Sequence, residues 1–295
     1  MNVESSPEIL MDLLKRFLPG RPQPAVETSL KPQPPLAEYI LGYCGESKDA
    51  QDYARKHLGR LVRTLEIIPP PVSGTDRILE MGAYMQITPA LKTKLGYGEV
   101  RGCYLGPLGV VDDKHATSST GEAFSCKIDL FNAEADRYPY PDEHFATVIC
   151  CELLEHLERD PMHMAYECNR ILRPGGYLVL STPNICSLRS ISHVIGGYHP
   201  ALFSQYIKPL DGADTNRHQR EYAPGEIAQL LDAAGFSVER IETGPYGLDR
   251  PSEYDWVLEV LKQRGAPLEL RDDTIHAVAK KTGPVKDRYP AWLYV

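Results

Sequence analysis

Two carboxylates and an imidazole lie close together in the segment Glu152-Leu153-Leu154-Glu155-His156. Such groups can hold a divalent cation, and a histidine can take a proton from a hydroxyl near neutral pH. We therefore consider three roles for Glu152, Glu155 and His156: a metal site, base catalysis or acceptor positioning by His156, and a purely structural role. Glu152 and His156 are taken as catalytic candidates, and the identity of any metal is left unknown.

A second polar group follows about sixty residues later. It consists of Arg217, His218, Arg220, Glu221 and Tyr222, and it closes a turn-rich stretch, 196–216, whose aromatic residues are Tyr198, Phe203 and Tyr206. His218 is a further catalytic candidate, and Arg220, Tyr222 and Tyr198 are candidates for substrate binding, because aromatic walls with a few polar groups are typical of ligand pockets. The alternative is that Arg220 and Glu221 form an ion pair that anchors the stretch.

A strand, a helix and a second strand are predicted to position the first group. The apolar runs 146–151 and 177–182 flank a segment whose apolar residues recur at helical spacing, and Arg173-Pro174-Gly175-Gly176 ends that helix. A helix between two apolar strands indicates parallel neighbours in an α/β sheet. Ligands bind beyond the carboxyl ends of such strands, where Glu152 and the segment 181–184 lie.

The remaining chain extends this pattern to a Rossmann-like α/β fold. We expect a mostly parallel sheet of seven strands, with helices on both faces and a helical N-terminal extension. The other strands are predicted at 77–82, 100–105, 124–131, 236–242 and 274–279, and helices at 6–18, 47–66, 88–96, 223–235 and 256–264. The predicted organisation is an extension over 1–70 that includes a proline-rich arm and could act as a lid, a main domain over 71–283 with an insertion at 185–222, and an aromatic tail over 284–295 that docks on the body.

Composition restricts the function classes. A net charge of −8 over 295 residues disfavours nucleic-acid binding, which would require a basic face. No apolar run is long enough to span a membrane, and the first residues do not form a signal peptide, so we expect a cytoplasmic protein without membrane contact. The seven cysteines have no CxxC spacing, which favours reduced thiols over disulfides or a zinc site.

The order of several motifs resembles class I S-adenosylmethionine-dependent methyltransferases. The motifs are ILEMG at 78–82, FNAE at 131–134, YPYPDEHF at 138–145, ELLEHL at 152–157, NRILRPGGYLVLSTPN at 169–184 and NRHQREYAPGEIAQLLDAAGF at 216–236. The segment 181–222 is similar to bacterial methyltransferases of sugar, polysaccharide and natural-product pathways. In some quinone O-methyltransferases a Glu-x-x-Glu-His cluster holds a divalent cation.

The resemblance implies S-adenosylmethionine as cofactor. The residues that it places at the cofactor are Glu80, Gly82, Ala83, Tyr104, Asn132, Ala133, Glu134 and Cys151. Glu80 would lie near the amino-acid end of the cofactor, and the segment 132–134 along its adenine and ribose. The alternatives are a turn or helix-cap role for Glu80 and ordinary loop capping by Asn132 and Glu134.

The chain departs from this family at two cofactor positions. Only the first glycine of the usual glycine-rich loop is kept, in Gly82, and Tyr84 and Gln86 are expected to crowd the backbone approach to the cofactor. Tyr104 ends the second strand where the family usually has an acid. A phenol can offer one hydrogen bond there but no carboxylate.

The sequence thus predicts a methyltransferase acting on a small-molecule acceptor, with the oxygen of a sugar, glycoside or natural product preferred over nitrogen or carbon. The alternative is a non-catalytic protein of the same fold that binds a partner or nucleotide. A nicotinamide oxidoreductase is disfavoured because GxGxxG after the first strand is missing. A homodimer is compatible with the sequence.

Overall fold

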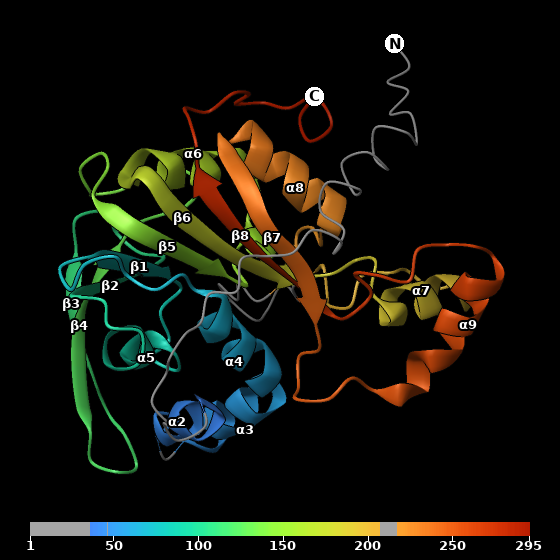
Figure 1. Ribbon diagram of the computed structural model, residues 1–295, viewed down its shortest axis with the longest axis horizontal. Helices are drawn as coiled ribbons and strands as arrows, with labels where there is room; N and C mark the ends of the chain where they lie inside the picture. Colours follow the sequence, from blue (N-terminus) through green and yellow to red (C-terminus); the bar gives the residue numbers. More distant parts are fainter. Residues whose placement is uncertain (1–35, 46, 207–216) are drawn as a thin grey trace.

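The computed structural model describes residues 36–45, 47–206 and 217–295. Its centre is one mixed sheet with the strand order β3-β4-β2-β1-β5-β6-β8-β7 (Figure 1). The parallel strands are β1 (Arg77–Met81), β2 (Glu99–Tyr104), β4 (Ala123–Leu130), β5 (Phe145–Cys151) and β6 (Leu172–Pro183). Strand β8 (Thr274–Lys281) runs antiparallel to both β6 and β7 (Phe236–Gly244). The predicted α/β class with a mostly parallel sheet is confirmed.

The sheet has one strand more than the sequence predicted. Strand β3 (Val111–Thr117) pairs antiparallel with β4 at the edge of the sheet. Nearly all its residues are exposed. The strand was missed because an edge strand whose two faces are both exposed to solvent lacks the apolar alternation by which strands are recognised.

Helices cover both faces of the sheet (Figure 1). One face carries α2 (Leu36–Gly42), α4 (Leu58–Ile67) and α5 (Thr88–Thr93), with α3 (Lys48–Lys56) beside α2, and the other face carries α6 (Pro161–Ile171) and α8 (Pro224–Ala233). Two further helices, α7 (Leu188–Ile195) and α9 (Asp255–Gln263), lie together beyond the sheet. Single turns of 3₁₀ helix span Leu154–His156 (η1) and Ser252–Tyr254 (η2).

The N-terminal extension is partly built into the core. Leu58, Leu61 and Leu65 of α4 are buried in the same apolar cluster as Ile78 of β1 and Val179 of β6. The single helix predicted over 47–66 is wrong, because the chain breaks at His57 into α3 and α4. The predicted helix at 6–18 and the proline-rich arm up to residue 35 lie outside the described residues, so the lid role stays a prediction.

The aromatic C-terminal tail lies against the body of the protein. Trp292, Leu293 and Tyr294 pack on the core cluster that contains the apolar side chains of α6 and α8. The hydroxyl of Tyr294 accepts a hydrogen bond from the backbone N–H of Met162 at 2.9 Å. The predicted docking of this tail is confirmed.

Two further sequence expectations concern helices and thiols. Within the described ranges, no helix is both long enough and apolar enough to cross a bilayer. All seven cysteines are free thiols, and five of them are buried.

Candidate active site

The carboxyl ends of five parallel strands bring most of the predicted site residues to one edge of the sheet. Glu80 precedes the end of β1, Tyr104 ends β2 and Asn132 follows β4. On the other side of β1, Glu152 follows β5, and Ser181 lies near the end of β6 in register with Cys151. Because neighbouring parallel strands end at the same edge, segments more than one hundred residues apart in sequence form a continuous polar rim.

The turn after β1 is compact and is held by Tyr104. Gly82 has a φ of +71°, a conformation that glycine adopts without strain, and the following Ala83 is fully buried. The Tyr104 hydroxyl donates a hydrogen bond to the Ala83 carbonyl. A Cβ on Gly102 would lie 2.6 Å from the Ala83 Cβ, so the close approach of this turn to β2 requires glycine there. Tyr84, which was expected to crowd the turn, is 70% exposed.

Glu80 is a buried carboxyl group at this turn. Only 6% of the residue is exposed, and within the described part of the chain Oε2 has no hydrogen-bond partner. Burial raises the pKa of Glu80 from 4.5 to about 8, with a smaller opposing contribution from Thr88. The cost of burying an unpartnered oxygen would be relieved by a donor on a ligand. In this respect the site fits the amino-acid end of S-adenosylmethionine, which the sequence assigned to Glu80.

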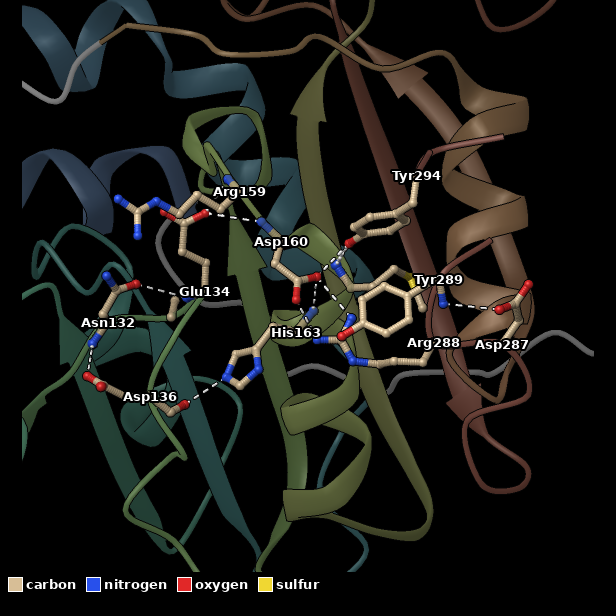
Figure 2. Close-up of polar contacts among 12 residues, drawn as sticks. Asn132, Glu134, Asp136, Arg159, Asp160, His163, Asp287, Arg288, Tyr289 and Tyr294 are labelled. Carbon is tan, nitrogen blue, oxygen red and sulfur yellow. Dashed lines mark hydrogen bonds and ion pairs between the residues drawn. The ribbon is translucent and has the colours of Figure 1, made fainter. Parts of the chain in front are cut away.

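Side chains of the loop after β4 hold it together and tie it to the segment before α6 (Figure 2). The Asn132 Oδ1 accepts a hydrogen bond from the backbone N–H of Glu134 at 3.0 Å, and the Asn132 N–H donates to Asp136 Oδ2 at 2.7 Å. Glu134 Oε2 accepts from the backbone N–H groups of Glu158 and Arg159 at 2.9 and 2.8 Å. Asn132 and Glu134 therefore perform the loop capping that we gave as their alternative role. Their predicted contact with the adenosine stays a prediction.

Asp160 connects this loop to the C-terminal tail (Figure 2). Its carboxylate caps α6 by accepting from the His163 N–H at 3.0 Å. It also accepts two hydrogen bonds from Arg288, at 2.9 and 2.6 Å, and one from the Tyr294 hydroxyl at 2.5 Å. The sequence Asp160-Pro161 is itself a helix-start signal, but no local pattern pointed to partners 128 and 134 residues away.

Glu152 points toward helix α4. Its φ is +52°, and its Oε1 accepts a hydrogen bond from the Ser181 hydroxyl at 3.0 Å. Its Oε2 lies 3.8 Å from Nε of the buried Arg60. Burial raises the pKa of the preceding Cys151 to about 11, so its thiol is protonated at neutral pH. Sequence reasoning missed Arg60, since helical spacing does not reveal which polar residue will face a neighbouring element.

Glu155, His156 and His218 form a compact cluster at the same edge. Within it, one possible ligand atom of each residue lies within 4.8 Å of the others. Glu155 is 1% exposed, and its Oε2 accepts from the Thr182 hydroxyl at 2.9 Å. Its Oε1 lies 3.9 Å from His156 Nε2, and the rings of His156 and His218 meet edge to face at 4.9 Å. Burial, reinforced by the charge of Glu152, raises the pKa of Glu155.

The metal-capable set thus differs from the one weighed from the sequence. Among the residues that the structure describes, His218 joins Glu155 and His156, whereas Glu152 is not part of the group. The reason is tertiary. The segment that carries His218 folds back onto the turn after β5, where the backbone N–H of Gln219 donates to the Glu155 carbonyl at 2.7 Å.

The ion pair between Arg220 and Glu221, which was the alternative to a substrate-binding role, is not formed. Arg220 Nη2 lies 2.6 Å from Glu226 Oε1 instead. The Glu221 carboxylate accepts from the backbone N–H groups of residues 202 and 203 at 3.0 to 3.2 Å and lies 3.2 Å from His218 Nδ1. Glu221 therefore anchors the insertion through backbone groups and the histidine ring rather than through arginine.

The aromatic candidates occupy different environments. Tyr222 is 1% exposed and belongs to the core, whereas Tyr198 and Tyr206 are 75% and 87% exposed. Phe203 is the aromatic residue that faces the cluster, with its ring 4.1 Å from that of His218 and 6.1 Å from that of Tyr246. The aromatic wall of Tyr198, Phe203 and Tyr206 and substrate binding by Arg220, Tyr222 and Tyr198 stay predictions.

Several buried polar atoms at the carboxyl edge lack hydrogen-bond partners among the described residues. They belong to Arg60, Glu80, Glu155, Tyr246, Thr274 and His276. Tyr246 follows β7, and His276 lies near the start of the antiparallel strand β8. Burial, with smaller contributions from Arg60 and Arg63, lowers the pKa of His276 from 6.5 to about 3. Polar ligands or water at this edge would supply the missing partners.

Comparison with known proteins shows that the segment containing these strands is similar to methyltransferases. Residues 80–180 match a family model described as a methyltransferase domain. The chain is 31% identical over 129 residues to a probable S-adenosylmethionine-dependent methyltransferase of Mycolicibacterium smegmatis, covering 44% of this chain and 43% of that protein. It is 30% identical over 117 residues to a ubiquinone biosynthesis O-methyltransferase of Thiobacillus denitrificans, covering 40% and 47%. The aligned regions thus span less than half the length of these curated relatives.

A solved structure shares the fold. It is the putative methyltransferase in a complex with the Trm112 methyltransferase activator from Haloferax volcanii, with a TM-score of 0.51 at 14% identity, covering 83% of this chain and 98% of that chain. The segment matched by the family model begins at Glu80 and includes β2, β4 and β5 with the loops that follow them, and most of β6.

Proposed function

We propose that this chain, which carries a class I S-adenosylmethionine-dependent methyltransferase domain, transfers a methyl group to a hydroxyl oxygen of a small molecule. The observation that carries the proposal is that candidate residues for the donor and for the acceptor lie at the same edge of the sheet. The segment 80–180 that matches the methyltransferase model contains Glu80 at one part of the carboxyl edge and Glu155 and His156 at another. In an in-line displacement the acceptor oxygen must be held next to the methyl group, opposite the sulfur that leaves. This edge offers polar groups for both donor and acceptor.

On the donor side, the proposed cofactor residues are Glu80, Gly82, Ala83, Tyr104, Asn132, Ala133, Glu134 and Cys151. S-adenosylmethionine supplies an electrophilic methyl group when it is bound. The tight turn at Gly82 and the internally bonded loop at Asn132 hold their backbones in place before a ligand arrives. Such preorganisation reduces the ordering cost of binding.

On the acceptor side, the chain has to take up a hydroxyl group and its proton. In the reaction the acceptor oxygen forms a bond to the methyl carbon while the carbon–sulfur bond breaks, and the hydroxyl proton leaves the oxygen. We place the acceptor hydroxyl beside the cluster of Glu155, His156 and His218, where an imidazole nitrogen can accept its proton. Glu152 follows β5, bonds to Ser181 and lies beside Arg60 of α4, and it is proposed to position the acceptor.

A polar acceptor fits this edge better than a purely apolar one. The Tyr246 hydroxyl is buried and has no hydrogen-bond partner within the described ranges, and the nearby Arg60 guanidinium is also buried. A hydroxylated sugar, glycoside or natural product could satisfy such groups. A relative named for O-methylation in ubiquinone biosynthesis supports oxygen as the atom methylated. Arg220, Tyr222 and Tyr198 are the remaining proposed substrate residues.

The first test is binding of the cofactor product. S-adenosylhomocysteine well above its dissociation constant should raise the melting temperature, since a ligand that binds only the folded state stabilises it. Absence of any shift at millimolar concentration would favour the non-catalytic alternative.

The second test separates binding from turnover. Methyl transfer from labelled S-adenosylmethionine would be measured against panels of sugars, glycosides and phenols. The substitution His218→Phe keeps a ring against Phe203, so we expect at least a tenfold loss of turnover with unchanged S-adenosylhomocysteine affinity. The exposed His115 provides a matched control, His115→Phe. Unchanged turnover in His218→Phe would remove this histidine from the catalytic role.

A further inference from the structure

We propose that Glu155, His156 and His218 bind a divalent transition-metal ion of the zinc class. The site joins the turn after β5 to the insertion before α8, two segments about sixty residues apart. The ion binding itself is independent of the proposed function. Only its catalytic role, to act on the acceptor hydroxyl, rests on that function.

The three side chains already converge on a common point. Their possible ligand atoms lie within 4.8 Å of one another, and Glu155 Oε1 lies 3.9 Å from His156 Nε2. A zinc ion lies about 2.1 Å from nitrogen and oxygen ligands. A shift of the side chains toward the ion by about an ångström would therefore complete the coordination, and His156, which is 30% exposed, has room to move.

Both histidines carry the outer partners that metal-binding histidines need. His156 Nδ1 lies 2.8 Å from the carbonyl oxygen of Arg217, and His218 Nδ1 lies 3.2 Å from Glu221 Oε1. A ring nitrogen that donates to a carbonyl or carboxylate fixes the tautomer and leaves Nε2 with the lone pair that binds a metal. Both histidines are therefore held in the tautomer that a metal ligand needs.

The carboxylate provides a second, independent indication. Glu155 is 1% exposed, and its Oε1 has no hydrogen-bond partner among the described residues, although Oε2 is bonded to Thr182. An unpartnered carboxylate oxygen in the interior carries a large desolvation cost. A cation between Glu155 and the two imidazoles would remove that cost.

The ligand set also selects the metal. Two imidazole nitrogens and one carboxylate oxygen suit zinc and its neighbours, whereas magnesium prefers oxygen ligands. Glu152, which would have supplied a second carboxylate, is bonded to Ser181 and lies beside Arg60 instead. An ion held by three protein ligands would keep an open position. A hydroxyl bound there would lose its proton more readily, and because both imidazoles would then be ligands, the proton would pass to solvent water.

The test uses the full-length chain without a histidine tag, stripped of metal by chelation. Cobalt(II) is the spectroscopic probe, because its visible absorption reports its coordination, and zinc and magnesium are competitors. We expect one cobalt ion per chain, displaced by zinc but not by an equal concentration of magnesium. His218→Phe and Glu155→Gln should each weaken cobalt binding by at least about 10-fold, because loss of a ligand should cost no less than loss of its outer partner. Glu155→Gln can keep the hydrogen bond from Thr182 and so guards against a folding artefact.

Two further variants decide the ligand set. Glu152→Gln and the exposed-histidine control His115→Phe should leave cobalt affinity within twofold of the wild type. Loss of binding in Glu152→Gln with retention in His218→Phe would overturn the proposed ligand set. Stoichiometric binding that none of the four substitutions changes, or no binding at all by the wild-type chain, would overturn the site. None of these outcomes depends on methyl transfer, so they are distinct from a failure of the proposed function.

Discussion

Two polar regions of the molecule differ in how completely their groups are partnered. The first, which we call the loop network, comprises Asn132, Glu134, Asp160, Arg288 and Tyr294, and it joins the loop after β4 to the C-terminal tail through hydrogen bonds (Figure 2). The second, which we call the unpartnered edge, comprises Arg60, Glu80, Glu155, Tyr246 and His276. Each of these five has a buried atom without a hydrogen-bond partner in the described part of the chain.

The difference indicates which polar groups stabilise the fold and which ones could gain free energy by binding a ligand. Satisfied polar groups stabilise a loop, whereas a buried polar atom without a partner is costly until a ligand, water or ion provides one. The loop network should therefore lose stability when it is altered. Selected positions of the unpartnered edge should tolerate or even gain from substitution in the absence of ligands.

The largest effect is expected at Glu80. Its pKa in the folded protein, about 8, lies above the ordinary value of 4.5, so between these pH values the native state binds more protons and stability falls as the pH rises. Between pH 5 and pH 8 the wild type should lose about 3 kcal/mol relative to Glu80→Gln, by urea unfolding without ligand. The exposed Glu253→Gln is the control. Parallel pH profiles for wild type and Glu80→Gln would contradict an unpartnered Glu80.

Asp160→Ala should give the largest loss in the loop network. The substitution removes the cap of α6 and leaves Arg288 and Tyr294 without their common acceptor, so we expect a loss of about 2 to 3 kcal/mol in urea unfolding at pH 7. Partial burial opposes ionisation, but hydrogen bonds from Arg288 and Tyr294 lower the pKa of Asp160. Its contribution should therefore be present above the ordinary aspartate range and disappear as the pH falls through the lowered pKa. Asp287→Ala, whose carboxylate bonds only locally to the Tyr289 N–H among the described residues, should cost far less.

His276 should give a pH dependence of stability opposite to that of Glu80, because the buried imidazole destabilises the fold as the pH falls. The pKa of this buried histidine is about 3 when folded against 6.5 ordinarily, so the unfolded chain binds more protons between these values. From pH 7 to pH 5 the wild type should lose about 2 kcal/mol more than the variant His276→Leu. Acid titration of stability by circular dichroism measures this, with His115→Leu as the exposed control. A larger acid loss in the variant would mean that His276 is partnered after all.

Tyr294→Phe is the mildest change. It deletes one hydrogen bond to Asp160 and the acceptor of the Met162 N–H while keeping the ring packed, so a loss of about 1 kcal/mol is expected. Tyr289→Phe is the matched control, because that ring is 60% exposed. Equal unfolding free energies for the two variants would show that the hydrogen bonds of the Tyr294 hydroxyl do not stabilise the fold.

The main fold could be predicted because its signals are local. The apolar runs of β5 and β6, with the amphipathic α6 between them, have the lengths and spacing of a parallel pair, and glycine and proline mark the ends. The split of one predicted helix at His57 and the exposed strand β3 escaped prediction, since neither changes the apolar periodicity. The identity of Glu152 and Glu155 as edge residues followed from their place after a strand.

Sequence alone determined which chemical groups follow the parallel strands, such as Glu152 and Glu155 after β5, because the ends of strands are marked by short-range patterns. Tertiary structure decided how those groups are shared. In the folded chain Glu152 lies beside Arg60, and Glu221 accepts hydrogen bonds from backbone N–H groups. His218 lies in one cluster with Glu155. These outcomes depend on contacts between segments many residues apart, which packing and the competition of buried polar groups for partners select and which no local spacing encodes.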